Sequence, residues 1–279
     1  MLIPVDGINI NIEVFLSETA DHSIIFIHGF SGSGKDWKNV ISKLPENICK
    51  VTIDFPGHGR SDSPEPLRYY ESVFLNKVIN SVIVFLDLKH VILAGYSMGG
   101  RVALTYAVNH QKNIDAIILE STTAGLQSES ERKSRILQDE YLSKRIEQNG
   151  IDDFVEYWTN LELFKSQKKL PIEIQQQIKI EKLKNNPRGL KNSLHGFGTG
   201  KMISVWERLR LSQIPTLLIT GEEDKKFTSI NTEMVKLIPG AKHVVVENAG
   251  HNVHLEKPEV FVNLIKEFLI SISHKKEDT

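Results

Sequence analysis

Short apolar runs recur along the chain, and segments of helical length separate most of them. Several of these runs are continuously apolar, as buried parallel strands are. We expect strands at residues 8–16, 23–27, 50–54, 91–95, 115–120, 215–220 and 243–247. We expect helices at residues 71–86, 99–110, 229–237 and 258–272. This alternation predicts an α/β protein with a mostly parallel, doubly wound central sheet flanked by helices.

The alternation stops between residues 122 and 211, where charged amphipathic segments replace the strand-like runs. Three of these segments predict helices, at residues 128–149, 151–160 and 172–185. Because this stretch lies between two strands of the sheet, its ends should emerge side by side at the sheet's edge and place it as a lid. We therefore predict a core of residues 1–121 and 212–279 and a helical cap of residues 122–211.

The composition is that of an ordinary globular protein, with 40% apolar and 25% charged residues. Its 34 Lys and Arg nearly balance its 35 Asp and Glu, which argues against a nucleic-acid partner. The single cysteine, Cys49, cannot form an internal disulfide, and residues 1–6 carry no export signal. No run approaches the roughly 18 apolar residues of a membrane span. We expect a cytoplasmic protein without membrane insertion, either a monomer or a small homo-oligomer.

The strongest chemical signal is the sequence VILAGYSMGG at residues 91–100, in which an apolar strand runs through G-x-S-x-G into a helical pattern. This is the context of a nucleophile elbow, a tight turn that exposes a reactive serine. Gly95 and Gly99 flank Ser97 because larger side chains there would collide with neighbouring backbone. We predict that Ser97 is the reactive serine, in preference to a serine that merely caps the helix.

A serine hydroxyl needs a base, and the base needs a carboxylate to orient it. In this type of fold the carboxylate and then the histidine follow the serine along the chain. Asp224 and His251 each stand just past the carboxyl end of a predicted strand, where open α/β sheets build their sites. We predict a triad of Ser97, His251 and Asp224, with Glu222 and Glu223 as alternatives for the carboxylate.

An oxyanion hole should combine two backbone amides. One is the amide of Met98, which follows the serine, and the other comes from the loop after an earlier strand. Phe30 is the expected second donor, because Gly29 permits close backbone approach. We expect His28 and His58, in nearby strand-end turns, to be structural.

One segment imitates a different chemistry. Residues 29–35 fit the phosphate-binding pattern G-x-x-x-x-G-K, and Asp54 ends a strand as a Mg²⁺-site carboxylate would. However, Asp36 stands where that pattern needs a Ser or Thr hydroxyl. His251 and His254 lie three residues apart without further ligands at a recognisable spacing, so His254 should line the pocket or pack. We predict neither a metal nor a cofactor.

Several cations are candidate substrate ligands. Arg101 lies in the first turn of the elbow helix, where the helix dipole disfavours a positive charge. Two interpretations stay open: an ion pair with an acid such as Glu120, or a grip on a substrate carboxylate beside the serine. In the predicted cap, Arg132 and Arg135 are three residues apart and could aim together into the cleft.

The predicted cap offers further candidates. Lys184 and Arg188 are additional cations, although most cations on such helices belong to a solvated face. Trp158 could form an aromatic wall. An acidic substrate would explain both the lid and Arg101.

Five runs carry a resemblance to a known family: GYSMGGRVA from residue 95, LESTTAGL from 119, ERKSR from 131, YW at 157–158 and GEEDKKF from 221. Over nearly its whole length the chain resembles an α/β-hydrolase-fold protein. Its motifs resemble those of the 2-succinyl-6-hydroxy-2,4-cyclohexadiene-1-carboxylate (SHCHC) synthases of menaquinone biosynthesis. Generic hydrolases share the elbow but not this set.

The resemblance implies a lyase that needs no cofactor or metal. It would eliminate pyruvate from 2-succinyl-5-enolpyruvyl-6-hydroxy-3-cyclohexene-1-carboxylate. Ser97 would act as the base on a ring proton alpha to the succinyl ketone, activated by His251 and Asp224. The amides of Phe30 and Met98 would hold the developing enolate oxygen.

The resemblance also places Tyr96, Arg101, Arg135 and Trp158 at substrate contacts, and the three carboxylates of this substrate would account for the cations. One position departs from the family pattern. Where related sequences have an arginine before an asparagine-rich turn, this chain has Lys184, so a bidentate fork becomes a point charge. Arg188 could substitute for it.

Two other functions stay open. One is a serine hydrolase of esters, or of carbon–carbon bonds in acidic diketones, which the triad cannot distinguish from a lyase. The other is a non-catalytic ligand-binding module on the same fold. The intact Ser, His and Asp argue against the module, which would not need all three.

Overall fold

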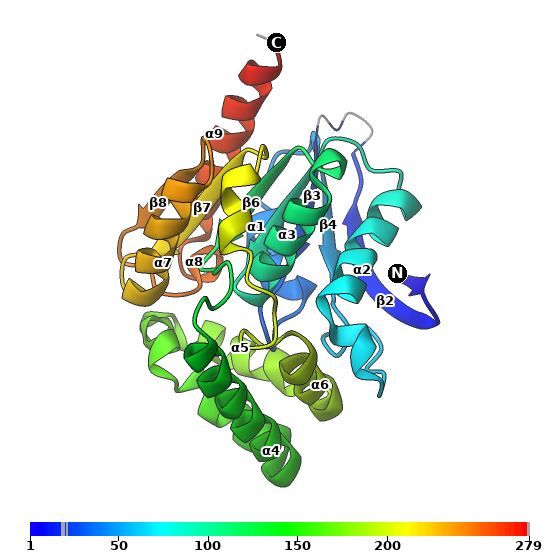
Figure 1. Cartoon of the computed structure of the whole chain (residues 1–279), viewed down its shortest axis with the longest axis vertical. Coiled ribbons are helices and arrows are strands. Elements are labelled where there is room, and N and C mark those ends of the chain that lie inside the picture. Colours follow the sequence, from blue (N-terminus) through cyan, green and yellow to red (C-terminus); the bar gives the residue numbers. More distant parts are fainter. Residues whose placement is uncertain (18–19, 21, 278–279) are drawn as a thin grey trace.

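An eight-stranded sheet runs through the molecule in the computed structural model, which describes residues 1–17, 20 and 22–277, the last four without their side chains (Figure 1). The strands are β1 (Leu2–Val5), β2 (Ile8–Phe15), β3 (His22–Ile27), β4 (Ile48–Ile53), β5 (Val91–Tyr96), β6 (Ala116–Glu120), β7 (Thr216–Gly221) and β8 (Lys242–Val246). Their order is β1-β2-β4-β3-β5-β6-β7-β8. The β1–β2 and β2–β4 pairs are antiparallel and the others parallel, which confirms the predicted sheet. The strand β1 was not predicted.

Helices cover both faces of the sheet. They are α1 (Lys38–Ile41), α2 (Ser72–Phe85), α3 (Met98–Asn109), α4 (Glu129–Thr159), α5 (Ile172–Leu183), α6 (Pro187–Phe197), α7 (Lys225–Leu237), α8 (Val253–Glu256) and α9 (Pro258–Glu277). Apolar side chains of α2, α3 and α7 form the core on one face, and those of α1 and α9 form the core on the other. Burial on both faces explains why the central strands are continuously apolar.

The predicted helical insertion is confirmed between β6 and β7. Its helices α4, α5 and α6 lie together beyond one end of the sheet (Figure 1). Apolar side chains of α4 and α6 form a small separate core that includes Leu142, Phe154 and Leu190. The helices predicted at 128–149 and 151–160 are the two segments of α4, which meet at a kink at Gly150, where φ is 82° and ψ is −174°. We propose residues 122–211 as the limits of this insertion, which is called the cap below.

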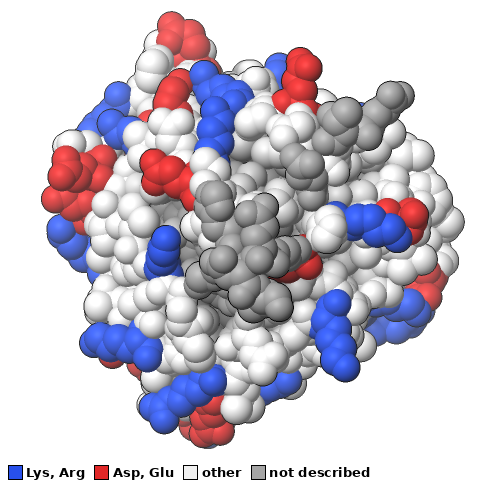
Figure 2. All heavy atoms as spheres, turned by 90° about the horizontal axis from the view of Figure 1, so that it is seen from above, with Lys and Arg blue, Asp and Glu red and all other residues white. Residues whose placement is uncertain are grey.

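The face seen in Figure 2 lies on the side away from the cap. Basic and acidic side chains are interspersed there, and neither sign covers a large area of that face. Among the described helices, none is both long enough and apolar enough to span a bilayer.

Candidate active site

Ser97 occupies the turn between β5 and α3, with φ 51° and ψ −106°. Such positive φ values are unusual outside glycine and mark a backbone held by its surroundings. A Cβ atom on Gly99 would lie 2.3 Å from the carbonyl oxygen of Ile27, so the turn requires glycine there. The Ser97 amide donates to the carbonyl of Glu120 at 2.8 Å, which fixes the turn to β6. The geometry is that of a nucleophile elbow.

Three side chains from separate strand ends meet at this turn. The His251 Nε2 atom lies 3.2 Å from the Ser97 hydroxyl oxygen. The other ring nitrogen, Nδ1, lies 2.6 Å from Oδ2 of Asp224. Asp224 and His251 are both buried. This arrangement leaves Nε2 unprotonated and able to take the serine proton when Nδ1 carries the hydrogen toward the carboxylate.

The three candidate carboxylates have different partners in the structure. Besides His251, Asp224 accepts the amide of Phe227 at 3.2 Å and so caps α7. Glu222 instead accepts the amide of Asn248 at 3.2 Å, and Glu223 pairs with Lys169 of the cap at 2.6 Å. Among the three, only Asp224 contacts the histidine.

The loop after β3 packs against the elbow. A Cβ atom on Gly29 would lie 2.6 Å from the Tyr96 ring and 3.6 Å from the Ser97 Cβ atom. The next residue, Phe30, lines the same cavity as Ser97 and Met98. In the described part of the chain, the amides of Phe30 and Met98 donate to no protein acceptor. Both amides are therefore available to a ligand oxygen.

The neighbouring histidines have structural partners. His28 accepts the Phe55 amide at 3.1 Å through Nε2, and the Nδ1 atom of His58 lies 3.2 Å from the Pro56 carbonyl. His254 is fully buried, stacks on Trp37 with ring centroids 3.9 Å apart, and does not line the cavity.

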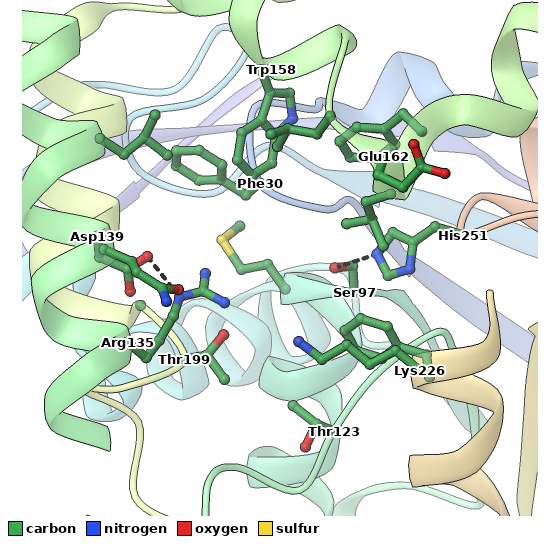
Figure 3. A pocket seen from close by; sticks show the side chains of 18 of the residues that line it. Phe30, Ser97, Thr123, Arg135, Asp139, Trp158, Glu162, Thr199, Lys226 and His251 are labelled. Atoms are coloured by element: carbon green, nitrogen blue, oxygen red, sulfur yellow. Dashed lines mark hydrogen bonds and ion pairs between the residues drawn. The ribbon is translucent and has the colours of Figure 1, made fainter. Parts of the chain in front are cut away.

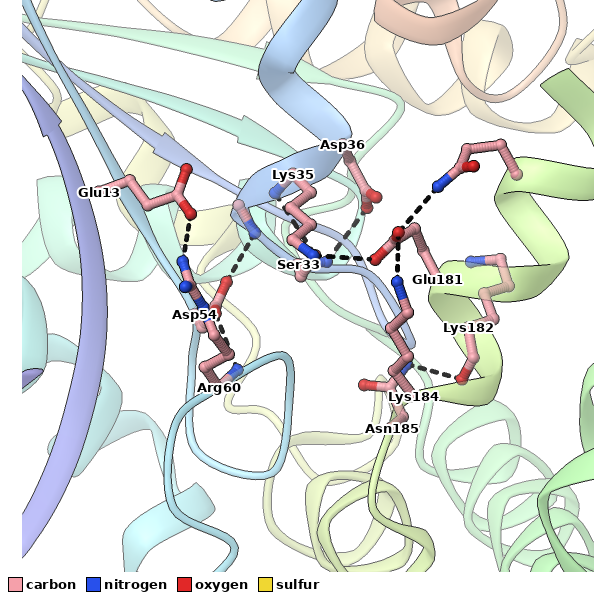
Figure 4. A network of polar contacts seen from close by, with 12 residues as sticks. Glu13, Ser33, Lys35, Asp36, Asp54, Arg60, Glu181, Lys182, Lys184 and Asn185 are labelled. Carbon is pink, nitrogen blue, oxygen red and sulfur yellow. Dashed lines mark hydrogen bonds and ion pairs between the residues drawn. The ribbon is translucent and has the colours of Figure 1, made fainter. Parts of the chain in front are cut away.

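The segment that imitates a phosphate-binding loop is structural as well. The buried Asp54 accepts the Arg60 amide at 2.9 Å (Figure 4). It also accepts the Gly34 amide at 2.7 Å and the Asn11 side chain at 2.9 Å. Both carboxylate oxygens of Asp54 therefore accept hydrogen bonds from the protein and join neighbouring loops. Within the described residues there is no group of three or more His, Cys, Asp or Glu side chains that could hold a metal.

A cavity of about 910 Å³ opens over Ser97, between the core and the cap (Figure 3). Aromatic side chains form one of its walls. The rings of Phe30 and Trp158 meet edge to face at 5.2 Å, and Phe164 lies 5.6 Å from Trp158. Phe227 lies 4.6 Å from the His251 ring. These aromatic rings make much of the cavity lining apolar, while the Ser97 side chain stays partly exposed within the cavity.

Arg101 contributes a buried cation to the lining of the cavity. Its Nη1 atom donates to the Phe197 carbonyl at 2.7 Å, and its Cζ atom lies 4.9 Å from the Phe197 ring. Burial, and then repulsion from Arg135, lower its pKa to about 9.

Of the two interpretations of Arg101, the ion pair with Glu120 is not formed, because the Glu120 carboxylate holds His254 instead. Asp139 attracts the Arg101 charge and partly offsets the effect of burial. No described carboxylate forms an ion pair with Arg101, so its guanidinium can still contact a ligand.

Arg135 reaches the cavity from α4. Its Nε atom donates to Oδ1 of Asp139, one helical turn on, at 2.8 Å. Asp139 is buried, and burial raises the pKa of its carboxyl while Arg135 opposes that rise. Asp139 thereby orients the guanidinium, and the other nitrogens of Arg135 point into the cavity (Figure 3). We did not predict Asp139; its signal is the i,i+4 spacing to Arg135.

Tyr96 lies beside the base, with ring centroids 5.3 Å from His251 and 5.1 Å from His254. Its phenol lines the cavity, and burial, reinforced by Glu120, raises its pKa well above the usual range. The hydroxyl therefore stays protonated and can donate a hydrogen bond to a ligand.

Lys226 is a cavity cation that the sequence analysis overlooked. It follows Asp224 by two residues, and its side chain is directed into the cavity (Figure 3). Its Nζ atom lies 5.7 Å from the Phe227 ring, and no described carboxylate pairs with it. Its position two residues after Asp224 is the feature of the sequence that could have identified it.

Three predicted ligands do not line this cavity. Arg132 is offset from Arg135 by about 60° around the helix, because three residues turn through about 300°, and it does not reach the cavity. Lys184 pairs with Glu181 at 2.6 Å in a separate polar network (Figure 4). Arg188 is exposed near the start of α6. The family's arginine position is therefore not replaced within the cavity by Lys184 or Arg188.

Comparisons with known proteins identify the family of the chain. Residues 22–258 match the model of the alpha/beta hydrolase fold family. A Bacillus subtilis protein named "Putative 2-succinyl-6-hydroxy-2,4-cyclohexadiene-1-carboxylate synthase" is 40% identical over 253 residues, which cover 91% of this chain and 92% of that protein. The chain belongs to the SHCHC synthase family. An Enterobacter protein named "2-succinyl-6-hydroxy-2,4-cyclohexadiene-1-carboxylate synthase" is 27% identical over 246 residues, which cover 88% of this chain and 91% of that protein.

Solved structures agree with that membership. MenH from S. aureus superimposes with a TM-score of 0.90 at 35% identity, covering 94% of this chain and 98% of that one. The esterase EaEST from Exiguobacterium antarcticum has a TM-score of 0.78 at 22% identity, covering 95% of this chain and 96% of that one. At that identity the esterase shows the shared fold alone.

Proposed function

We propose that this protein eliminates pyruvate from 2-succinyl-5-enolpyruvyl-6-hydroxy-3-cyclohexene-1-carboxylate, yielding the SHCHC for which its relatives are named. The observation that carries the proposal is Arg101, a buried cation that lines the same cavity as the Ser97–His251 pair and forms no ion pair with a described carboxylate. The nearby Asp139 attracts both Arg101 and Arg135, so one carboxylate faces two cations. A buried, unpaired charge is costly unless a ligand compensates it. An ester hydrolase for neutral substrates would have no use for it.

The cations fit a tricarboxylate. Arg101, Arg135 and Lys226 all line the cavity, and each can meet one carboxylate. Arginines bind carboxylates with paired hydrogen bonds, while a lysine acts as a point charge. The aromatic wall of Phe30 and Trp158 suits the ring and the apolar parts of such a substrate. Tyr96 supplies a further donor.

The chemistry follows from the positions of the polar atoms. His251, oriented by Asp224, takes the hydroxyl proton of Ser97 as the serine oxygen removes the ring proton alpha to the ketone. The electron pair moves onto the ketone oxygen, which the amides of Phe30 and Met98 would stabilise. The electrons then return through the ring and break the carbon–oxygen bond to the enolpyruvyl group. The departing enolate takes up a proton and becomes pyruvate, and the protonated His251 gives up the proton it received, which restores the base.

This proposal is tested by following pyruvate release from freshly prepared substrate against the spontaneous rate. Native protein should accelerate the release, and Ser97→Ala should reduce it by about 10³-fold or more, since it removes the reacting group. Release at the background rate with native protein would refute the proposal.

The main alternative is a serine hydrolase, because the same triad supports acyl transfer. Turnover of p-nitrophenyl acetate, measured in parallel, separates the two activities. Rapid ester turnover without pyruvate release would favour the hydrolase. Ligand binding that Ser97→Ala leaves unchanged, with no turnover of either substrate, would favour a non-catalytic module.

A further inference from the structure

The loop that carries His251 is fastened by one carboxylate. Glu256, in the short helix α8, accepts the amide of Gly250 at 2.8 Å through Oε2. Its other oxygen, Oε1, accepts the amide of Asn252 at 3.4 Å. These two amides belong to the residues immediately before and after His251. One side chain therefore holds the backbone on both sides of the base.

The same carboxylate also reaches the cap. The hydroxyl of Ser166, in the 3-10 helix η4 (Glu162–Lys169), donates to Oε1 of Glu256 at 3.0 Å. The contact is tight, since a Cβ atom on Gly250 would lie 1.9 Å from the Ser166 hydroxyl oxygen. From the same helix, the Phe164 ring lies 6.0 Å from the His251 ring. The cap thus rests directly on the loop of the base.

We propose that Glu256 is a positioning residue that aligns His251 and, through Ser166, makes that alignment depend on the seating of the cap. The inference rests on the proposed role of His251 as the base. Glu256 does not line the cavity, so it acts through the backbone of residues 250–252 rather than on the substrate. Substrate that fills the cavity beneath the cap would hold Ser166 in place and keep the base aligned.

Substitutions of the two partners test this role. Glu256→Ala removes all three hydrogen bonds and should lower kcat by about 10- to 100-fold, the effect of a displaced catalytic group, with KM within about twofold. Glu256→Gln keeps one acceptor oxygen and should restore part of that loss. Ser166→Ala should lower kcat by a few-fold. In Glu256→Ala, adding Ser166→Ala should have no further effect, because the serine has already lost its acceptor.

The matched control is Glu181→Ala. Glu181 is also a carboxylate that joins cap and core, through Lys35 at 3.4 Å, but it lies outside the cavity over Ser97. The Glu181→Ala variant should have the same kcat as the native protein. Thermal melting curves for every variant separate misalignment from unfolding.

A second readout does not depend on the natural substrate. Diethyl p-nitrophenyl phosphate modifies a serine that a histidine activates, so its rate of reaction with Ser97 reports on the base alone. Glu256→Ala should slow this reaction by a factor similar to its loss in kcat. If native protein released no pyruvate, the proposed function would fail, while this rate would still decide the role of Glu256.

The proposal is overturned if Glu256→Ala, measured well below its melting temperature, keeps a native kcat and a native rate of serine modification. It is also overturned if only KM rises, or if Glu181→Ala causes the same loss. Should Glu256→Ala fail to fold, native rates in both Glu256→Gln and Ser166→Ala would overturn it.

Discussion

Glu120 joins the elbow to the loop of the base, since its carbonyl accepts the Ser97 amide at 2.8 Å while its carboxylate holds His254. The carboxylate accepts the His254 amide at 3.0 Å, and its other oxygen lies 2.6 Å from His254 Nδ1. Both side chains are almost completely buried. One residue at the end of β6 therefore holds both the turn that carries Ser97 and the helix α8 that follows His251.

Glu120→Gln should lower the free energy of unfolding by about 2–3 kcal/mol, because an amide nitrogen would replace one of the two buried acceptors. Urea unfolding followed by tryptophan fluorescence measures the change. The control is Glu259→Gln, which removes an exposed pair with Lys43 and should have little effect. Equal losses in the two variants would contradict this account of Glu120.

Arg101→Gln should raise KM for the tricarboxylate by about 30-fold, the equivalent of one charge-assisted hydrogen bond of about 2 kcal/mol. Arg132→Gln is the matched control, because Arg132 does not line the cavity. Initial rates of pyruvate release across substrate concentrations measure both. A native KM in Arg101→Gln would show that the buried cation is structural only.

Lys226→Met should raise KM by about tenfold, less than the arginine change, because a lysine offers a point charge rather than a paired contact. Lys236 lies on the same helix but pairs with Glu233 on the surface at 2.6 Å. Lys236→Met should therefore behave as the native protein does. If the two lysine variants had the same KM, Lys226 would not contact the substrate.

His58 should make stability depend on pH. Burial, and then the neighbouring His28, lower the pKa of its imidazole well below 6.5. Below about pH 6.5 the unfolded chain takes up a proton that the folded protein does not. The free energy of unfolding should then fall with decreasing pH, by up to about 1.4 kcal/mol per pH unit from this group, until the folded pKa is reached.

Urea unfolding between pH 7 and pH 5 tests this dependence. The slope should flatten in His58→Gln relative to native protein and remain unchanged in His110→Gln, which alters an exposed histidine. An unchanged slope in His58→Gln would mean that other groups set the pH dependence.

The sequence predicted which residues form the proposed triad because each member follows a strand. Parallel strands that end at one edge of a sheet bring their following loops together, and Ser97, Asp224 and His251 do lie in contact there. The glycines on either side of Ser97 further identified this turn as a nucleophile elbow. These features depend on local sequence and on a topology that the alternating pattern already predicts.

The cap was harder to predict because its side-chain directions depend on how α4 and α5 pack on the core. Arg132 and Arg135 have similar local sequence, yet only Arg135 lines the cavity. The pair of Arg135 and Asp139 looks like an ordinary surface i,i+4 pair until α4 is placed over the cavity. Lys184 has the expected charge, but it pairs with Glu181 and does not line the cavity over Ser97.

The most direct test of the central claim, that Ser97 acts as a base in an elimination, is a single-turnover measurement with substrate deuterated at the ring carbon alpha to the ketone. Pyruvate release and the intact mass of the protein are followed together. The account predicts a primary isotope effect on pyruvate release and no covalent adduct on Ser97. Release without an isotope effect, accompanied by an acyl adduct on Ser97, would contradict it.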